Sequence, residues 1–215
     1  MKPYLPSLCA LLGALLGALL SAASLAAPPA PQANSCRIQL GGGPTVDYGK
    51  IKRSLLRAAE AAPLPAQQRS VTVICEQPAT LALRQSGVDG SASTAAGGRL
   101  GLAGETSHGI GLASGKPLGA FALRWRRDAA SIDGVPARLI VSSDGGATWR
   151  ELESDAVIGA ADLIAWTRGE QRRPASGRTL TAGVRIETAI APTSTLYLGR
   201  EVQLDGSISL SAVFP

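Results

Sequence analysis

Turn-forming residues divide the chain from Cys36 onward into short β-prone runs. This division restricts the folds that the chain can adopt. Residues 69–75 and 118–125 alternate between polar residues and β-branched, aliphatic or aromatic ones, as half-buried strands do. Asp133-Gly134 and Asp144-Gly145-Gly146 are hairpin signals. The 25 glycines and 14 prolines are too many for a helical bundle, and a hydrophobic content of 45% is too high for disorder. Further strands are expected at residues 36–40, 80–84, 137–142, 148–152, 179–190, 195–198 and 207–214.

One helix is expected, at residues 51–62, where Ile51, Leu55, Leu56 and Ala59 share a face before Pro63 ends it. About eight strands in roughly 180 residues are typical of a β-sandwich. The sequence therefore predicts one all-β domain over residues 36–215, an immunoglobulin-like Greek-key β-sandwich with one short helix after the first strand.

The first 26 residues have the pattern of a secretory signal peptide. Lys2 precedes an apolar stretch at 8–20, and Ser24 and Ala26 are small residues of the kind that signal peptidase reads. A retained transmembrane anchor is the alternative, because residues 5–27 are long enough to span a bilayer. Residues 27–35 form a proline-rich extension, and no second long apolar segment follows. We expect an exported protein with no integral membrane segment after cleavage, in the periplasm during transit and then at the cell surface or outside the cell.

Export leaves two of the three cysteines, because Cys9 lies in the signal. Cys36 and Cys75 are expected to form a disulfide in an oxidising compartment, with two free thiols as the alternative. The bond would tie together two early strands and contribute about 4 kcal/mol on the chain-entropy model. A metal site is not expected, because the one histidine, His108, lies in a glycine-rich loop and no paired cysteine spacing exists. No cofactor is expected either.

Charge and motifs argue against nucleic-acid binding and catalysis. The net charge of +5 is scattered, and no basic run exceeds the pairs Arg126-Arg127 and Arg172-Arg173. Ser114 is one place late for a nucleophile elbow, and Lys116 falls one residue away from a P-loop pattern. The carboxylates near the turns could form a pair, but turn and surface roles explain them equally well. The chain is not expected to be an enzyme, and a hydrolase ranks behind two non-enzymatic interpretations.

One local motif resembles the Asp-box, in which an aspartate in a hairpin turn accepts backbone hydrogen bonds above a packed tryptophan. Its residues here are Ser142, Asp144, Gly146, Thr148 and Trp149. The motif occurs once, whereas sialidase-like propellers repeat it from blade to blade. We interpret it as a clasp that holds the hairpin, and glycan binding by this loop is the alternative.

The order of motifs along the chain resembles that of chaperone–usher pilins. The likeness rests on Cys36, the Val46-Asp47-Tyr48-Gly49-Lys50-Ile51 segment, Cys75, and an alternating C-terminal strand with Phe214 as penultimate residue. More narrowly, Val46–Gly49, residues 71–80 and Asp205-Gly206-Ser207 are similar to a pilin-like family of unknown function from Gram-negative bacteria. Two departures are the terminal Pro215 and a long 124–149 region.

This resemblance implies an incomplete sandwich that lacks its last strand. A periplasmic chaperone lends a strand first, and the N-terminal extension of the next subunit replaces it when an usher assembles the pilus. The side chains expected to contact the partner strand fall on one face at period two: Ile208, Leu210, Ala212 and Phe214. The extension at 27–35 is a poor donor, which suggests a terminal position or a subunit that does not polymerise.

The expected function is therefore structural or adhesive. Its partners are a chaperone, an usher, other pilus subunits and a surface glycan or host receptor. A free-standing secreted carbohydrate-binding module is the alternative, with Trp149, Trp125 or Trp166 as a stacking platform.

Overall fold

The structure, a computed structural model, describes residues 35–87, 91–102, 106–199 and 201–215. The chain divides into two compact units, and all the described elements belong to the second, which begins at Asn34. The expected signal peptide and all of the expected extension except Ser35 lie outside the described residues.

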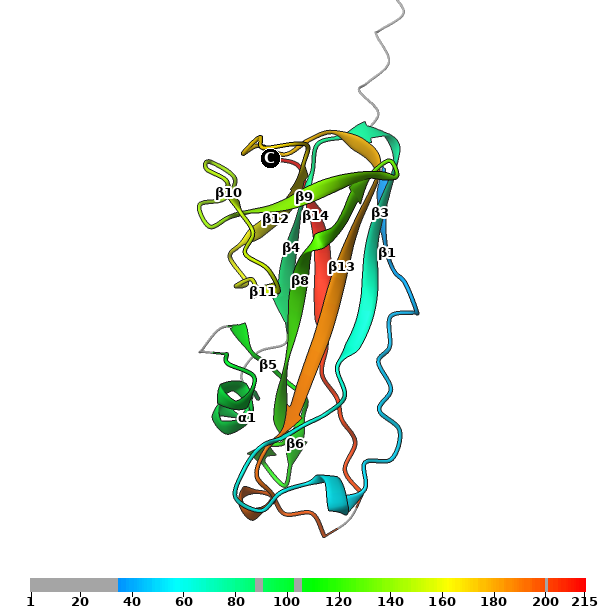
Figure 1. Cartoon of the computed structure of the whole chain (residues 1–215). Helices are drawn as coiled ribbons and strands as arrows, with labels where there is room; N and C mark the ends of the chain where they lie inside the picture. Colours follow the sequence, from blue (N-terminus) through cyan, green and yellow to red (C-terminus); the bar gives the residue numbers. More distant parts are fainter. Residues whose placement is uncertain (1–34, 88–90, 103–105, 200) are drawn as a thin grey trace, which may run out of the picture. The chain divides into compact units, whose positions relative to one another are not determined.

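Antiparallel strands are the main regular elements of the described chain (Figure 1). Eight of them follow one hydrogen-bonded path in the order β1-β3-β13-β8-β9-β12-β4-β14. Their bounds are β1 Cys36–Leu40, β3 Gln67–Ala79, β4 Ala82–Gly87, β8 Gly119–Ile132, β9 Val135–Ser142, β12 Leu163–Thr167, β13 Gly177–Ile190 and β14 Ile208–Val213. Short strands attach at the sides or form a separate hairpin: β2 Ala62–Pro63, β5 His108–Gly109, β6 Leu112–Ala113, β7 Lys116–Pro117, β10 Arg150–Glu151 and β11 Ala156–Val157.

The path folds into two layers because one hairpin turns from the first layer into the second. Strands β1, β3, β13 and β8 form one layer, and β9, β12, β4 and β14 form the other. The β8–β9 turn has positive φ at Asp133 (53°) and Gly134 (79°), so the predicted Asp-Gly hairpin is confirmed. A register shift opposite Ala182 and Gly183 bends β8 toward β9. Strands β8, β9 and β12 are successive neighbours on the path, and β13 then returns to lie beside β8, so the connectivity is of the Greek-key type.

The main core lies between the layers and is built from alternate residues of the long strands. Trp125 and Trp166 are both 0% exposed at its centre, and the indole of Trp166 donates a hydrogen bond of 2.6 Å to the Thr181 carbonyl. Around them pack Val71, Val73, Leu81, Leu83, Ile132, Leu139, Val141, Ile164, Leu180 and Val184. The predicted all-β sandwich is confirmed as a nearly closed one.

The helix predicted at residues 51–62 is wrong. Only Arg53–Leu55 forms a turn of 3-10 helix, and β2 begins at Ala62. The carbonyls of Arg57 and Ala58, which a helix would bond internally, instead accept hydrogen bonds from the Thr193 and Ser194 amides. Partners from the far end of the chain thus replaced the local helical bonds.

The α-helix lies at Thr94–Arg99 (α1), after β4, so its predicted place after the first strand is also wrong. Ser93 caps it by accepting a hydrogen bond from the Ala96 amide. Ala96 packs with Ala120 and Ala189 in a small cluster, which lets α1 approach β8 and β13 closely.

The remaining strands were predicted with errors at their ends. The strand predicted at 195–198 is wrong, because Thr193–Thr195 forms a 3-10 turn and no strand follows it up to Gly199. The strand predicted at 148–152 shortens to β10. In the described part of the chain, no helix is both long and apolar enough to cross a membrane.

Candidate functional site

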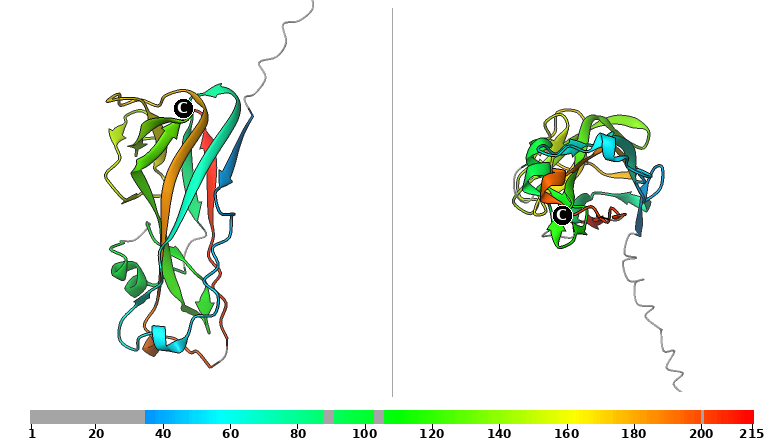
Figure 2. Two further views of the ribbon diagram at one scale, coloured as in Figure 1. Left: turned by 45° about the vertical axis from the view of Figure 1, so that its right-hand side comes forward. Right: turned by 90° about the horizontal axis from the view of Figure 1, so that it is seen from below.

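The two ends of the strand path, β1 and β14, form the most distinctive feature of the sandwich. Every pairing along the path is antiparallel, so these first and eighth strands run in opposite directions. Their Cα atoms approach within 8 Å, and both views in Figure 2 show the strands near each other. Within the described ranges, β1 pairs only with β3 and β14 only with β4. One side of each strand therefore carries backbone N–H and C=O groups that no ladder uses.

On β1 the inward residues are Cys36, Ile38 and Leu40, all half-buried against the main core. Cys36 stands directly opposite Cys75 of β3, with their Cα atoms 4.1 Å apart, and the predicted disulfide joins them. The bond fixes this edge strand to an interior strand at one end.

On β14 the inward residues are Ile208, Leu210 and Ala212, also half-buried against the main core. Phe214 is not brought together with them, because it lies past the end of the strand and is 55% exposed. We call the gap bounded by these six inward residues of β1 and β14 the edge groove. Its side chains are half-buried, and each packs against the main core.

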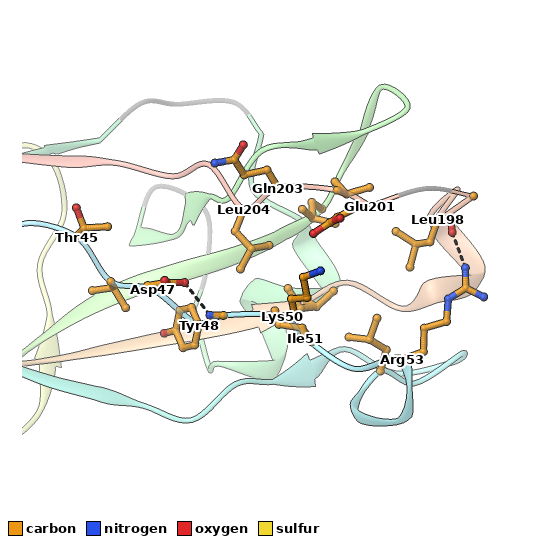
Figure 3. A pocket seen from close by; sticks show the side chains of 17 residues that line it. Thr45, Asp47, Tyr48, Lys50, Ile51, Arg53, Leu198, Glu201, Gln203 and Leu204 are labelled. Carbon is orange, nitrogen blue, oxygen red and sulfur yellow. Dashed lines mark hydrogen bonds between the residues drawn. The ribbon is translucent and has the colours of Figure 1, made fainter.

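A cavity of about 1,090 Å³, shown in Figure 3, is lined by the segments of chain next to these two strands. Residues 45–51 and 53 follow β1, and residues 198, 199 and 201–204 precede β14. Its floor is a second, smaller apolar cluster that includes Leu118 and Ile190. Figure 3 shows Leu204 pointing across the cavity toward the Asp47–Tyr48 side. We call this space the Tyr48 cavity.

The Asp47-Tyr48-Gly49 motif shapes one wall of the Tyr48 cavity. The Asp47 carboxylate accepts a hydrogen bond of 2.7 Å from the Gly49 amide, and Gly49 has a φ of +60°. The Tyr48 hydroxyl donates to Oγ1 of Thr188 on β13 at 2.9 Å. At the far end, the Arg53 guanidinium donates to the Leu198 carbonyl at 2.6 Å and ties the two walls together. Between these ties, Figure 3 shows Lys50 and Glu201 pointing toward each other from opposite walls.

Sequence reasoning missed the Tyr48 cavity, although a signal was present. Leu196, Leu198, Val202 and Leu204 recur at even positions, and all four are half-buried in the second cluster. This period-two pattern is that of a strand with one apolar face. The structure gives no strand ladder to this segment, which lies beside the open side of the sandwich.

The Asp-box-like hairpin forms the clasp that its sequence indicates. The Asp144 carboxylate accepts hydrogen bonds from the Thr148 amide (2.9 Å), the Thr148 hydroxyl (2.5 Å) and the Ser142 hydroxyl (2.7 Å). These bonds, led by the Thr148 hydroxyl, hold the pKa of Asp144 well below its usual value. Gly145 and Gly146 supply positive φ, and the Ser142 hydroxyl also accepts from the Gly146 amide.

Trp149 packs beneath this turn together with the end of β14. Its indole donates to the Gly146 carbonyl at 3.0 Å, and its ring packs with Val213 against a cluster that includes Ile140. Trp125 and Trp166 lie in the core, so the stacking platform considered for them is wrong. Trp149 remains half-buried and already serves the hairpin.

The described side chains give little support for a metal site or for a catalytic nucleophile. No group of three or more His, Cys, Asp or Glu in that part of the chain could hold a metal ion. The lone histidine, His108, is 3% exposed, with its Nε2 3.1 Å from Nε2 of Gln85. Ser114, considered as a nucleophile, lies in the β6–β7 turn with a φ of 49°. No family model matches the chain, and no curated protein matches it.

Proposed function

We propose that this protein is an exported, pilin-like structural subunit that binds a partner's β-strand in the edge groove. The observation that carries the proposal is the pair of open edges, β1 and β14, with half-buried apolar side chains between them. An added strand would pair with these edges and cover the apolar side chains, which are the two requirements of β-strand addition.

The geometry defines how such a strand would lie. A strand that pairs antiparallel with β14 runs parallel to β1, because the two edges are opposed. Neighbouring strands are about 4.8 Å apart, so two edges with a strand between them need about 9.6 Å. Insertion therefore widens the gap by at least about 1.6 Å where the Cα atoms now approach within 8 Å. The disulfide keeps the Cys36 end of β1 in place, and the rest of β1 can move because its ladder with β3 holds it on one side.

The partners follow from the same chemistry. An uncovered groove of this kind exposes apolar side chains and unpaired edges, which favour aggregation. A periplasmic chaperone would cover it first, and a neighbouring subunit delivered by an usher would replace the chaperone at the cell surface. We assign no catalytic step and no cofactor to the protein, and its role in adhesion would depend on the assembly that it joins.

The test uses the protein purified from the exported fraction. A synthetic peptide with large apolar residues at every second position should bind, raise the thermal midpoint and convert aggregates into monomer. A peptide of the same composition with the alternation removed is the control. If the protein alone is a monomer with reversible two-state unfolding, and the alternating peptide does not bind, the proposal fails.

A further inference from the structure

We infer that the strand filling the edge groove comes from a different protein, and that the N-terminal extension of a second copy of this chain does not fill it. The inference rests on the proposed function and adds the kind of partner. Two properties carry it: the side chains that line the acceptor, and the sequence of the expected extension.

The acceptor edge on β14 is short. The strand has six residues, Ile208–Val213, which an added strand would follow over about 20 Å. Residues 201–204, ahead of it, line the Tyr48 cavity and form no ladder.

The extension has few residues to spare. Ser35 is already used in the protein's own ladder, since its carbonyl accepts a hydrogen bond of 3.0 Å from the Glu76 amide. After the expected cleavage at Ala26, residues 27–34 are left, and they reach at most about 29 Å when fully extended. Some of these residues would also have to bridge the distance from one copy of the chain to the other.

The extension lacks the side chains and backbone donors that the groove requires. Residues 27–34 read Ala-Pro-Pro-Ala-Pro-Gln-Ala-Asn, so their largest hydrophobic side chain is proline. Pro28, Pro29 and Pro31 have no backbone N–H and cannot donate to a ladder. The groove presents large apolar side chains, among them Ile38 and Leu210, that need large partners.

The Tyr48 cavity makes the mismatch larger. Its 1,090 Å³ lies over apolar side chains such as Leu118 and Leu204, and alanines would leave most of it unfilled. Its charged lining residues are of both signs, with Asp47 and Glu201 beside Lys50 and Arg53. Charge therefore does not select the partner, and an apolar pattern at alternate positions does. The partner is an extended segment with large aliphatic or aromatic side chains at every second position.

The experiment appends one strand to the full chain after Pro215, through a short turn. The appended strand can then run back antiparallel to β14. Three versions are exported and purified: a designed 14-residue strand with Ile, Val or Phe at alternate positions, the same strand with its alternation shifted by one residue, and residues 27–34 of this chain. The shifted strand is the matched control, because a one-residue slip turns its apolar side chains to solvent. The readouts are the thermal midpoint, the monomer fraction and amide-exchange protection of β1 and β14.

We expect the designed strand alone to raise the thermal midpoint by several degrees and to protect both edges from exchange. If residues 27–34 do so as well as the designed strand, the inference is overturned while the strand-binding groove stands. If none of the three versions has an effect, or if the shifted strand performs as well as the designed one, the proposed function fails together with the inference.

Discussion

The hydroxyl of Tyr48 donates a hydrogen bond to Oγ1 of Thr188 across 140 positions of sequence, at 2.9 Å. Thr188 is 2% exposed and belongs to β13, in the interior of its layer, whereas Tyr48 lies in a segment without secondary structure. This bond holds one wall of the Tyr48 cavity against the sheet, so an irregular segment has a defined place.

Tyr48→Phe should lower the free energy of unfolding by about 1 kcal/mol, because Thr188 loses its partner in a buried place. The ring would remain and would still line the cavity. Denaturant unfolding measures the loss. Tyr48→Phe combined with Thr188→Val is the control, since removing both partners should restore most of the stability. If the double variant loses more unfolding free energy than the two single variants lose together, the bond does not have this role.

Gly49 and Gly98 form a matched pair for testing backbone conformation. A Cβ added at either position meets no atom within 4 Å, but only Gly49 has positive φ, at +60°. Gly49→Ala should therefore destabilise the protein by about 1–2 kcal/mol. Gly98→Ala, within α1, should stabilise it by about 0.4–1 kcal/mol. Thermal unfolding of both variants decides the matter, and equal effects of the same sign would refute the argument.

The Asp144 clasp should make stability depend on pH. Its pKa in the folded state is lowered, so the charged form contributes stability at neutral pH. That contribution is fully present above the unfolded-state pKa of about 3.9 and is lost as the pH falls further, through the folded pKa. Asp144→Asn should lower the thermal midpoint at pH 7, and the difference from the original protein should shrink below about pH 4. Melting curves from pH 7 to pH 2 measure this, and a constant difference would exclude the carboxylate as its source.

Ile208 and Ser209 are adjacent residues on opposite faces of β14, the first half-buried and the second exposed. Ile208→Asp should cost about 1–3 kcal/mol and abolish binding of the alternating peptide, because it places a charge in the groove. Ser209→Asp should change stability by less than about 0.5 kcal/mol and leave binding intact. Peptide titration of both folded variants makes the comparison. Equal binding by the two would place the peptide elsewhere.

Loss of the disulfide should destabilise the sandwich. Cys36→Ser should cost about 2–5 kcal/mol and reduce the yield of exported protein. Reduction of the unmodified protein should lower stability to a similar extent. Alkylation followed by intact-mass measurement provides the control, because native material should offer no free thiol at Cys36 or Cys75.

The pattern of neighbouring residues predicted those strands in which buried residues recur at every second position. Alternation placed residues 69–75 within β3 and most of residues 118–125 within β8, and the Asp133-Gly134 turn followed from its own chemistry. The helix at 51–62 failed because the carbonyls of Arg57 and Ala58 have partners near residue 193, which no local pattern reveals.

The site shows the same division. Ile208, Leu210 and Ala212 were predictable from period two, whereas the exposure of Phe214 depends on where β14 leaves its ladder with β4. Burial of Trp125 and Trp166 likewise depends on which strands meet across the core. The absence of a ladder between β1 and β14 is a property of the whole strand order, so only the family resemblance indicated it.

The position of the disulfide has a mechanical consequence. A pull on the chain ahead of Cys36 passes through the sulfur atoms directly to Cys75 and β3, a strand flanked on both sides. The disulfide closes a loop over the 39-residue separation between the two cysteines, and this loop contains β1 and the Tyr48 wall. The pulling force bypasses the loop, so these segments are not stretched. Under load, one side of the groove is thus shielded from stretching, and a strand lying in it would keep that edge while the rest of the molecule bears the force.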